Sequence, residues 1–411
     1  MPNQEIRSQE DLFNQVLGSS QKLEIGNLQQ MENLLEMNVQ PDVWEDASNR
    51  NLLSFNQEFA QGTTKFVFFS RGIKHIYLIS FFTNLIDLDL SNNNISDISS
   101  IAKLKNLKKL DLNSNSIEDI SALQSIHDLT HLYLSCNKFT SYTLALPNLV
   151  ELLLGYNSLK NKSGLQHSPK LERLYLSGTE TIDLRSIPHQ LFGLKVLQLS
   201  QNKITQISHL SNFLNLQRLN LDYNYWLQNI QPIKFCTQLT ELRIFTTSIS
   251  DIWPLQFLKN LKTLIIAKTQ VVDLHPLQYL YQLESIYAYD ACIIDVSPLS
   301  KLTQLKDLDF RKNKITNAET LKHHKNISEY DFSNQQVPTT DELKLYSKIL
   351  SVHSSQKQIK KIQAENRTSK FKESMTHLQK QINYKINEQT RSMNKKIEIW
   401  VQFIQNSKAD Q

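Results

Sequence analysis

Residues 85–95 read LIDLDLSNNNI and place apolar side chains and one asparagine in the order L-x-x-L-x-L-x-x-N-x-I. The same order returns at residues 107–117 and again at 129–139, 22 residues later each time. Eight further copies begin at Leu149, Leu171, Leu194, Leu216, Leu239, Leu261, Leu283 and Leu305. The steps between copies are 20, 22 or 23 residues, and a degenerate copy flanks the array on each side. These 11 clear repeats indicate a stack of similar units rather than several unrelated domains.

Each repeat carries the pattern of one short strand. Leu88 and Leu90 alternate with Asp87 and Asp89, which is typical of a strand with one buried face. After the turn, several repeats read Asp-Ile-x-x-Leu or a close variant, and proline there suits the first turn of a short helix. We therefore expect an α/β fold, a curved solenoid with a parallel sheet on its concave face and short 3-10 or helical turns on its convex face.

The repeated asparagine predicts a structural ladder, because its amide can satisfy backbone groups inside a turn that water cannot reach. The ladder comprises Asn93, Asn115, Asn137, Asn157, Asn202, Asn224 and Asn313. Four repeats carry another residue at this position, namely Thr179, Thr247, Thr269 and Ala291. We therefore expect a less regular stack over residues 240–300. The 23-residue steps should make the outline bulge near Thr181 and Trp226.

The repeat is identified as a leucine-rich repeat. Its 22-residue form, with Asp-Ile-Ser or Asp-Ile-x-Pro after the strand, resembles two groups of proteins. One is the leucine-rich-repeat regulatory subunit of type-1 protein phosphatase, and the other is the internalin-like proteins of bacteria and protists. The resemblance covers about residues 63–335. It implies a non-catalytic protein that binds a protein partner on its concave face, with type-1 phosphatase as one candidate partner.

Side chains between the strand leucines should point to the concave surface, where two apolar and aromatic clusters emerge. The first comprises Tyr133, Leu153, Tyr156 and Tyr175. The second comprises Phe245, Ile265, Tyr287 and Tyr289, with Arg243 beside it. Aspartates lie outside both clusters, and exposed aromatic side chains flanked by charge match the composition of binding hot spots. Stacking between adjacent strands explains the same pattern without a partner.

Charge and periodicity divide the chain into three parts. We expect a helical or mixed N-terminal cap at residues 1–62, the solenoid at 63–336 and a basic amphipathic helical tail at 337–411. Residues 1–62 hold 3 basic and 10 acidic side chains, whereas residues 341–411 hold 14 basic and 7 acidic ones. An apolar stripe at helical spacing follows the tail: Phe371, Met375, Leu378, Ile382, Ile386, Met393, Ile397, Trp400 and Ile404. It favours self-association, as a coiled coil, or partner binding; membrane contact and a free helix are the alternatives.

The motifs of catalysis are missing from the sequence. The three cysteines are an odd, scattered set that suits neither a disulfide framework nor a metal site. There is no glycine-rich phosphate loop and no His-Glu-x-x-His sequence, and the histidine pairs lack supporting carboxylates. We expect no enzyme activity, no metal site and no cofactor, and the sequence does not favour nucleic acid as a partner.

The compartment is inferred from the start of the chain and from its hydropathy. The first residues, MPNQE, have neither the basic nor the apolar part of a signal peptide, and no run of 18 apolar residues occurs. We therefore expect the cytoplasm or the nucleus. Three hypotheses follow: an intracellular scaffold or phosphatase regulator, an internalin-like surface or secreted adhesin, and a membrane or cytoskeletal adaptor that acts through the basic C-terminal helix.

Overall fold

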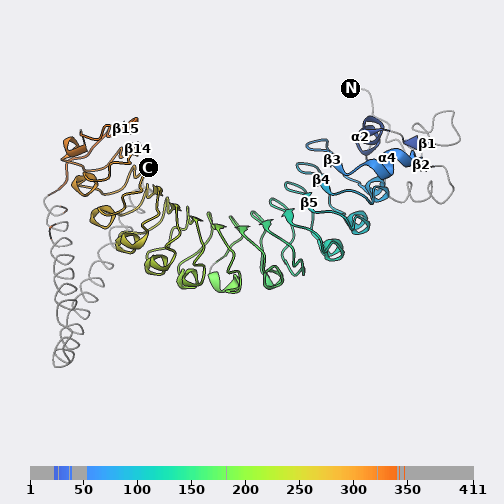
Figure 1. Ribbon diagram of the computed structural model, residues 1–411, viewed down its shortest axis with the longest axis horizontal. Helices are drawn as coiled ribbons and strands as arrows, with labels where there is room; N and C mark the ends of the chain where they lie inside the picture. The colour runs from blue at the N-terminus through green and yellow to red at the C-terminus, as the bar shows by residue number, and fades with distance from the viewer. Residues whose placement is uncertain are drawn as a thin grey trace, which may run out of the picture. The chain divides into compact units, whose positions relative to one another are not determined.

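The computed structural model describes residues 23–25, 27–36, 38, 53–181, 183–321, 323–339, 342 and 347. In this part of the chain, thirteen short strands form one open sheet in which each strand pairs in parallel with the next along the sequence. The strands are β3 (Lys65–Val67), β4 (Asp87–Asp89), β5 (Lys109–Asp111), β6 (His131–Tyr133), β7 (Glu151–Leu153), β8 (Arg173–Tyr175), β9 (Val196–Gln198), β10 (Arg218–Asn220), β11 (Glu241–Arg243), β12 (Thr263–Ile265), β13 (Ser285–Tyr287), β14 (Asp307–Asp309) and β15 (Glu329–Asp331). The sheet lines the inner side of an arc of repeats (Figure 1).

Short 3-10 helices occupy the outer side of the arc (Figure 1). Within the described residues they are η1 (Tyr77–Phe81), η2 (Ser99–Lys103), η3 (Ser121–Ser125), η4 (Ser163–His167), η5 (Leu184–Ser186), η6 (Ser208–Asn212), η7 (Gln231–Phe235), η8 (Trp253–Phe257), η9 (His275–Leu277), η10 (Ser297–Leu299) and η11 (Ala318–Leu321). None exceeds 5 residues, because a 22-residue repeat leaves no room for a longer helix. The predicted α/β solenoid, with a parallel sheet inside and 3-10 turns outside, is therefore confirmed.

One repeat shows how the sequence produces this shape. Leu88, Leu90, Ile95, Ile101 and Leu104 are all buried between the strand and the outer turn. Each such side chain contributes about 1.5–3 kcal/mol of gross transfer free energy, most of which the loss of chain entropy offsets. The buried residues recur at the same positions in each repeat, so the stacked repeats share one continuous apolar core.

The aspartate of the Asp-Ile-x-x-Leu sequence starts the outer turn. Asp97 Oδ1 accepts a hydrogen bond of 2.8 Å from the backbone N–H of Ser99, and Asp251 Oδ1 accepts one of 2.7 Å from Trp253. A carboxylate at this position satisfies an N–H group that the first turn of a helix leaves without a partner. The aspartate lies one residue before the N-cap, so it has a structural role at the start of these outer turns.

The asparagine side chains bridge neighbouring repeats. Asn93 Nδ2 donates to the carbonyl oxygens of Phe68 and Leu90, each at 2.8 Å. Its Oδ1 accepts from the backbone N–H groups of Arg71, at 2.9 Å, and Ile73, at 3.1 Å. One buried amide therefore satisfies polar backbone groups of two successive turns.

Threonine supplies only part of this bonding. The hydroxyl groups of Thr247 and Thr269 each donate one hydrogen bond, to the carbonyl groups of Ile244 and Ile266. The expected irregularity over residues 240–300 is nevertheless wrong for the sheet, because β11 to β14 keep a one-to-one register. Backbone hydrogen bonds between successive turns continue in this region and keep the repeats aligned. The N–H of Gln270 donates to the Ile249 carbonyl at 2.9 Å, and the N–H of Cys292 donates to the Val271 carbonyl at 3.2 Å.

The 20-residue repeat changes the outer side locally. Its fully described chain passes from β6 to β7 without a 3-10 helix, and Ser141 pairs with Asn161 in an isolated bridge. The backbone N–H of Gly164 donates to the Tyr142 carbonyl at 2.9 Å. A Cβ atom on Gly164 would lie 2.8 Å from the backbone nitrogen of Leu144. Glycine is therefore required where the shortened repeat lies directly on η4.

A small mixed unit precedes the first repeat. Its elements are β1 (Leu23–Ile25), α2 (Leu28–Glu36), β2 (Leu53–Phe55) and α4 (Gln57–Gly62), and β1 pairs with β2 in a separate parallel sheet. Arg71 of the first repeat forms ion pairs with Glu32, at 3.4 Å, and Glu36, at 3.6 Å, on α2. The Phe59 ring of α4 packs edge-on against Phe82 with centroids 5.2 Å apart. The first repeat is therefore joined to this unit by both charge and aromatic packing.

The apolar stripe predicted for the tail lies outside the described residues. The coiled coil and the self-association proposed for the region after residue 339 therefore stay predictions. None of the helices in the described part of the chain is both long and apolar enough to cross a membrane.

Candidate functional site on the concave face

Three residues of the first predicted cluster lie side by side on the sheet. Tyr133, Leu153 and Tyr175 end three successive strands and face one another in register. Glu151 lies between the two tyrosines: its Oε2 accepts from the Tyr133 hydroxyl at 3.2 Å and is 3.3 Å from Arg173 Nε. Burial, followed by the nearby Glu151 carboxylate, raises the pKa of Tyr133 to about 12. These rings are partly exposed and held in fixed positions, as a preorganised contact surface requires.

Tyr156, the fourth predicted member, lies apart from this column. It occupies the turn after β7 with a φ of 57° and is half exposed. A Cβ atom on Gly178 would lie 2.7 Å from Cδ1 of Tyr156, so the ring covers the glycine backbone of the next repeat. The structure therefore places Tyr156 at the rim of the sheet rather than in the cluster.

The second predicted cluster also forms in part through strand register. Arg243, Ile265 and Tyr287 are adjacent on β11, β12 and β13. Phe245 and Tyr289 lie just beyond the strand ends, with ring centroids 5.9 Å apart. The structure therefore brings all five predicted residues onto one region of the sheet and its rim.

A buried carboxylate positions two members of this cluster. Asp222 Oδ2 lies 2.7 Å from the Arg243 guanidinium, and its Oδ1 accepts from the backbone N–H of Phe245 at 2.8 Å. Burial raises the pKa of Asp222, against the opposing effect of its hydrogen bonds and of Arg243. The carboxylate thus fixes the direction of Arg243 and the backbone that presents Phe245.

Three aromatic residues that the sequence analysis missed extend the second cluster. The Tyr223 ring meets Phe245 edge-on at 5.0 Å and Tyr225 at 6.4 Å, and Tyr225 meets Trp226 at 6.3 Å. Tyr225 and Trp226 are 53% and 59% exposed, so they add the most accessible rings of the group. The sequence feature that points to them is the 23-residue spacing between Leu216 and Leu239, which places one extra residue beside Trp226. We name Trp226, Tyr225, Tyr223, Phe245 and Tyr289 the aromatic row.

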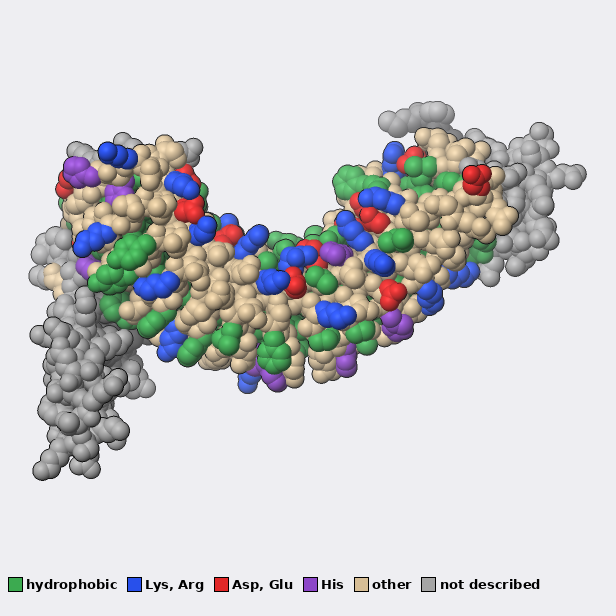
Figure 2. Space-filling model, in the orientation of Figure 1, with side chains coloured by type: hydrophobic (Ala, Val, Ile, Leu, Met, Phe, Trp, Pro, Cys, Tyr) green, Lys and Arg blue, Asp and Glu red, His purple; other side chains and the backbone are tan. Residues whose placement is uncertain are grey.

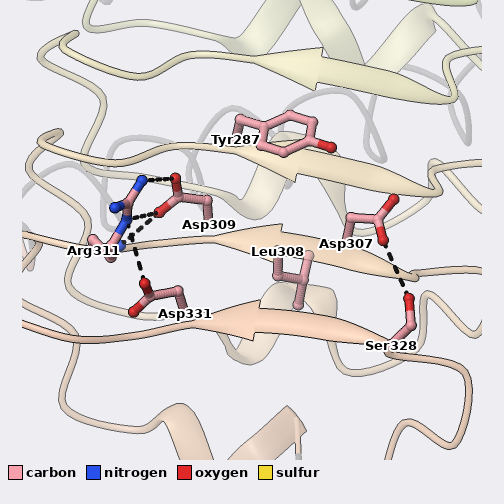
Figure 3. A pocket seen from close by; sticks show the side chains of 7 residues that line it. All are labelled: Tyr287, Asp307, Leu308, Asp309, Arg311, Ser328 and Asp331. Atoms are coloured by element: carbon pink, nitrogen blue, oxygen red, sulfur yellow. Dashed lines mark hydrogen bonds and ion pairs between the residues drawn. The ribbon is translucent and has the colours of Figure 1, made fainter.

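A polar hollow of about 440 Å³ lies next to the aromatic row (Figure 3). Arg311 forms ion pairs with Asp309, at 2.7 Å, and Asp331, at 3.4 Å, and its guanidinium lies 5.6 Å from the centre of the Tyr289 ring. Asp307 lies on the other side of the hollow. Carboxylates outnumber cationic side chains in its lining, so this end of the concave face is acidic.

Asp307 is held by hydroxyl groups. Ser328 donates to its Oδ1 at 3.2 Å (Figure 3). Ser285 donates to its Oδ2 at 3.0 Å. In the described part of the chain it has no ion pair within 4 Å. Its charge therefore remains available to a basic group of a partner.

Carboxylates also lie toward the opposite end of the face, where Lys65 and Lys109 stand in register with Asp87. Asp89 and Asp111 are opposite each other on β4 and β5. Burial, and to a lesser extent the charges of Asp89 and Asp87, raise the pKa of Asp111 to about 6. The concave face thus has aromatic side chains in its middle and carboxylates toward both ends.

Replacing Asp111 with asparagine should stabilise the fold at neutral pH. A carboxyl group whose pKa is raised on folding binds its proton more tightly in the folded chain, so the free energy of unfolding falls as pH rises from about 4 through 6. Asp111→Asn removes this loss and keeps an acceptor for the Asn113 N–H. We expect a gain on the order of 1 kcal/mol at pH 7, after allowing for solvent screening, and almost none at pH 4. Urea unfolding from pH 4 to 7 measures it, and an unchanged pH slope would contradict it.

The described residues contain no group of three or more His, Cys, Asp or Glu side chains arranged to hold a metal ion. The side chains of the concave face thus offer contact area, hydrogen bonds and charge to a second molecule.

Comparisons with known proteins agree with this geometry. The family described as Leucine Rich repeats (2 copies) matches residues 83–125 and 105–146. An internalin of Listeria monocytogenes is 28% identical, covers 68% of this chain and 90% of its own, and has a TM-score of 0.59. A leucine-rich-repeat protein of Leptospira interrogans is 22% identical, covers 80% and 82%, and has a TM-score of 0.58. The chain therefore has the leucine-rich-repeat fold and resembles the internalins.

A plant peptide hormone receptor, RGFR1, solved in complex with RGF2, shares the fold at 20% identity. It covers 78% of this chain and 55% of its own, with a TM-score of 0.54. None of the curated proteins is significantly similar to the chain in sequence.

Proposed function

We propose that the concave face binds a protein partner, and that the chain is a non-catalytic scaffold or regulatory subunit. The observation that carries this proposal is the pair of aromatic groups on this face: Tyr133 and Tyr175 around Glu151, and the aromatic row beyond the strand ends. Rigid aromatic side chains supply large contact areas at low cost in entropy and dominate interface energetics. Leucine-rich-repeat proteins are generally binding scaffolds, and the plant receptor of this fold is in complex with RGF2.

The charges of the concave face constrain the partner. Asp111 lies toward one end of the face and Asp307 toward the other, so a complementary partner carries basic groups at both ends of an apolar centre. Type-1 protein phosphatase remains a candidate from the resemblance of the repeats. We also propose a cytoplasmic or nuclear location for the scaffold.

A second candidate function is a surface or secreted adhesin. The 28% identity to an internalin over 68% of this chain favours it. Fluorescence localisation of the tagged full chain in its own cell distinguishes the two candidates: the scaffold is inside the cell, and the adhesin reaches the surface or the medium.

Replacing Tyr133 and Tyr175 together with alanine should abolish partner capture. Two truncated hot-spot rings weaken binding by about 3 kcal/mol, which is more than a hundredfold in the dissociation constant. Both rings are only partly buried, so we expect the melting temperature to fall by no more than a few degrees. Affinity capture from a lysate of the source cells, followed by calorimetry on the purified variant, measures both quantities.

A matched control is the double variant Tyr279→Ala with Tyr281→Ala. These two tyrosines are 44% and 53% exposed but lie on an outer turn, so their removal should leave capture intact. Equal loss of capture in both variants, or full capture by the concave variant, would contradict the assignment of the concave face.

A further inference from the structure

Exposed hydrophobic side chains gather on five consecutive outer turns, away from the concave face. Six of the 14 large hydrophobic side chains that are exposed in the described residues lie here, with exposed fractions from 44% to 63%. They are Phe192, Leu214, Phe235, Phe257, Tyr279 and Tyr281. We name these six residues the outer ridge. Single exposed apolar residues are ordinary, but a contiguous set calls for an explanation.

The ridge follows from the repeat register. Phe192, Leu214 and Tyr281 each precede the first leucine of a repeat by two residues, whereas Phe235, Phe257 and Tyr279 precede it by four. Equivalent positions of stacked repeats lie side by side, so Phe235, Phe257 and Tyr279 form one row over three successive repeats. Phe192 and Leu214 form a second pair, two residues further along the turn, in the two repeats before them. Figure 2 shows hydrophobic side chains along the outer edge of the visible face of the arc.

Side-chain hydrogen bonds fix neighbouring turns against one another along the outer ridge. Asn215 Nδ2 donates to the carbonyl oxygen of Phe192 at 2.8 Å, and Lys259 Nζ donates to that of Tyr279 at 3.4 Å. Both bonds cross from one repeat to the next. The ridge is therefore built into the stack and does not depend on the conformation of a single loop.

The charge of the ridge is of one sign. The five turns, residues 187–193, 210–215, 233–238, 255–260 and 277–282, contain no aspartate or glutamate. Lys234 Nζ lies 5.1 Å from the ring centre of Phe235, and Lys259 Nζ lies 5.6 Å from that of Tyr279. Two of the exposed rings thus have a lysine beside them, and none of the five turns contains a carboxylate.

We propose that the outer ridge binds an anionic lipid membrane surface. Aromatic rings favour the boundary between headgroups and acyl chains, and lysines beside them are attracted to anionic headgroups while their stems cover apolar surface. These turns offer no carboxylate, so anionic headgroups meet no like charge on them. Because the ridge and the concave face use different residues, one chain could hold a protein partner and a membrane at the same time.

The test uses the full chain and co-sedimentation with phosphatidylcholine vesicles, with or without phosphatidylserine. Wild type should bind the vesicles that contain phosphatidylserine more tightly. The triple variant Phe235→Ser, Phe257→Ser and Tyr279→Ser should lose at least about tenfold in vesicle affinity, because each removed ring weakens insertion. It retains every charge of the chain, so attraction of the basic tail to the vesicles is the same in both proteins.

The matched control is Tyr225→Ser with Trp226→Ser, which removes two rings of similar exposure from the aromatic row. It should bind vesicles like wild type, and all three proteins should give the same thermal melt. Replacing Lys234 and Lys259 with glutamine should reduce the preference for phosphatidylserine.

Three results would overturn the proposal. One is absence of vesicle binding by wild type, and another is unchanged binding by the triple variant. The third is a triple variant that binds vesicles normally but no longer captures a protein, which would assign the ridge to a protein partner. The first two results do not bear on the concave face, whose proposed function is tested separately by the tyrosine variants.

Discussion

Replacing Gly164 with alanine is expected to lower the free energy of unfolding by about 3 kcal/mol, the upper part of the range for overpacking. The new Cβ atom would lie 2.8 Å from Leu144 N, Leu144 O and the backbone carbon of Thr143. All three are main-chain atoms of the neighbouring repeat, so no side chain can rotate away to make room. Either η4 or the bridge between Ser141 and Asn161 must shift. Chemical denaturation followed by circular dichroism measures the effect.

Gly193→Ala provides the matched control. A Cβ atom there meets only Leu171 O, at 3.7 Å, which is an ordinary contact. We expect stability within about 0.5 kcal/mol of wild type, or slightly higher, because alanine restricts the unfolded chain. A Gly164→Ala variant as stable as Gly193→Ala would mean that the shortened repeat does not constrain η4.

Replacing Asn202 with alanine is expected to destabilise the fold by about 4 kcal/mol. Its Oδ1 accepts from the backbone N–H groups of Thr179, at 3.1 Å, and Thr181, at 2.9 Å. Its Nδ2 donates to the carbonyl oxygens of Leu176, at 2.9 Å, and Leu199, at 3.0 Å. Alanine would leave these groups buried without a partner, and each unsatisfied group costs about 1–3 kcal/mol. Urea unfolding of the purified variant determines the difference.

Asn202→Thr is the informative comparison. Threonine stands naturally at the equivalent positions 247 and 269, where its hydroxyl donates to the carbonyl group three residues earlier. It should restore that bond at position 202 but not the two bonds that Oδ1 accepts. An intermediate loss, near half that of alanine, is therefore expected. Equal losses for threonine and alanine would show that the donated bond contributes little.

Most of the fold could be predicted from the period of the repeats in the sequence. A spacing of 22 residues places one strand and one turn in each unit, and stacking then defines the parallel sheet. The expected irregularity over residues 240–300 is wrong for the sheet, because it considered only side chains, whereas on the outer side η9 and η10 shorten to 3 residues. Gln270 and Cys292 show that backbone bonds between turns continue where the asparagine is replaced.

The candidate site could be predicted from the sequence only where its residues lie on strands. Tyr133, Leu153 and Tyr175 are neighbours because of strand register, which the sequence shows directly. Tyr156 and Tyr223 lie instead in turns with positive φ, where the direction of a side chain depends on the local backbone. Alternation along a strand does not describe such positions, so the sequence pattern does not show which side chains lie beside Tyr156 or Tyr223.

The repeat count also determines a length. Strands β5 and β14, which carry Asp111 and Asp307, are separated by nine strand steps in the sheet. At about 4.8 Å for each step, the two acidic ends lie roughly 43 Å apart along the sheet. Gain or loss of one repeat between these strands changes the distance by one strand spacing and leaves the residues at both ends unchanged. The number of repeats therefore sets the length of the binding surface. A partner that contacts both ends must match this length as well as the chemistry of the surface.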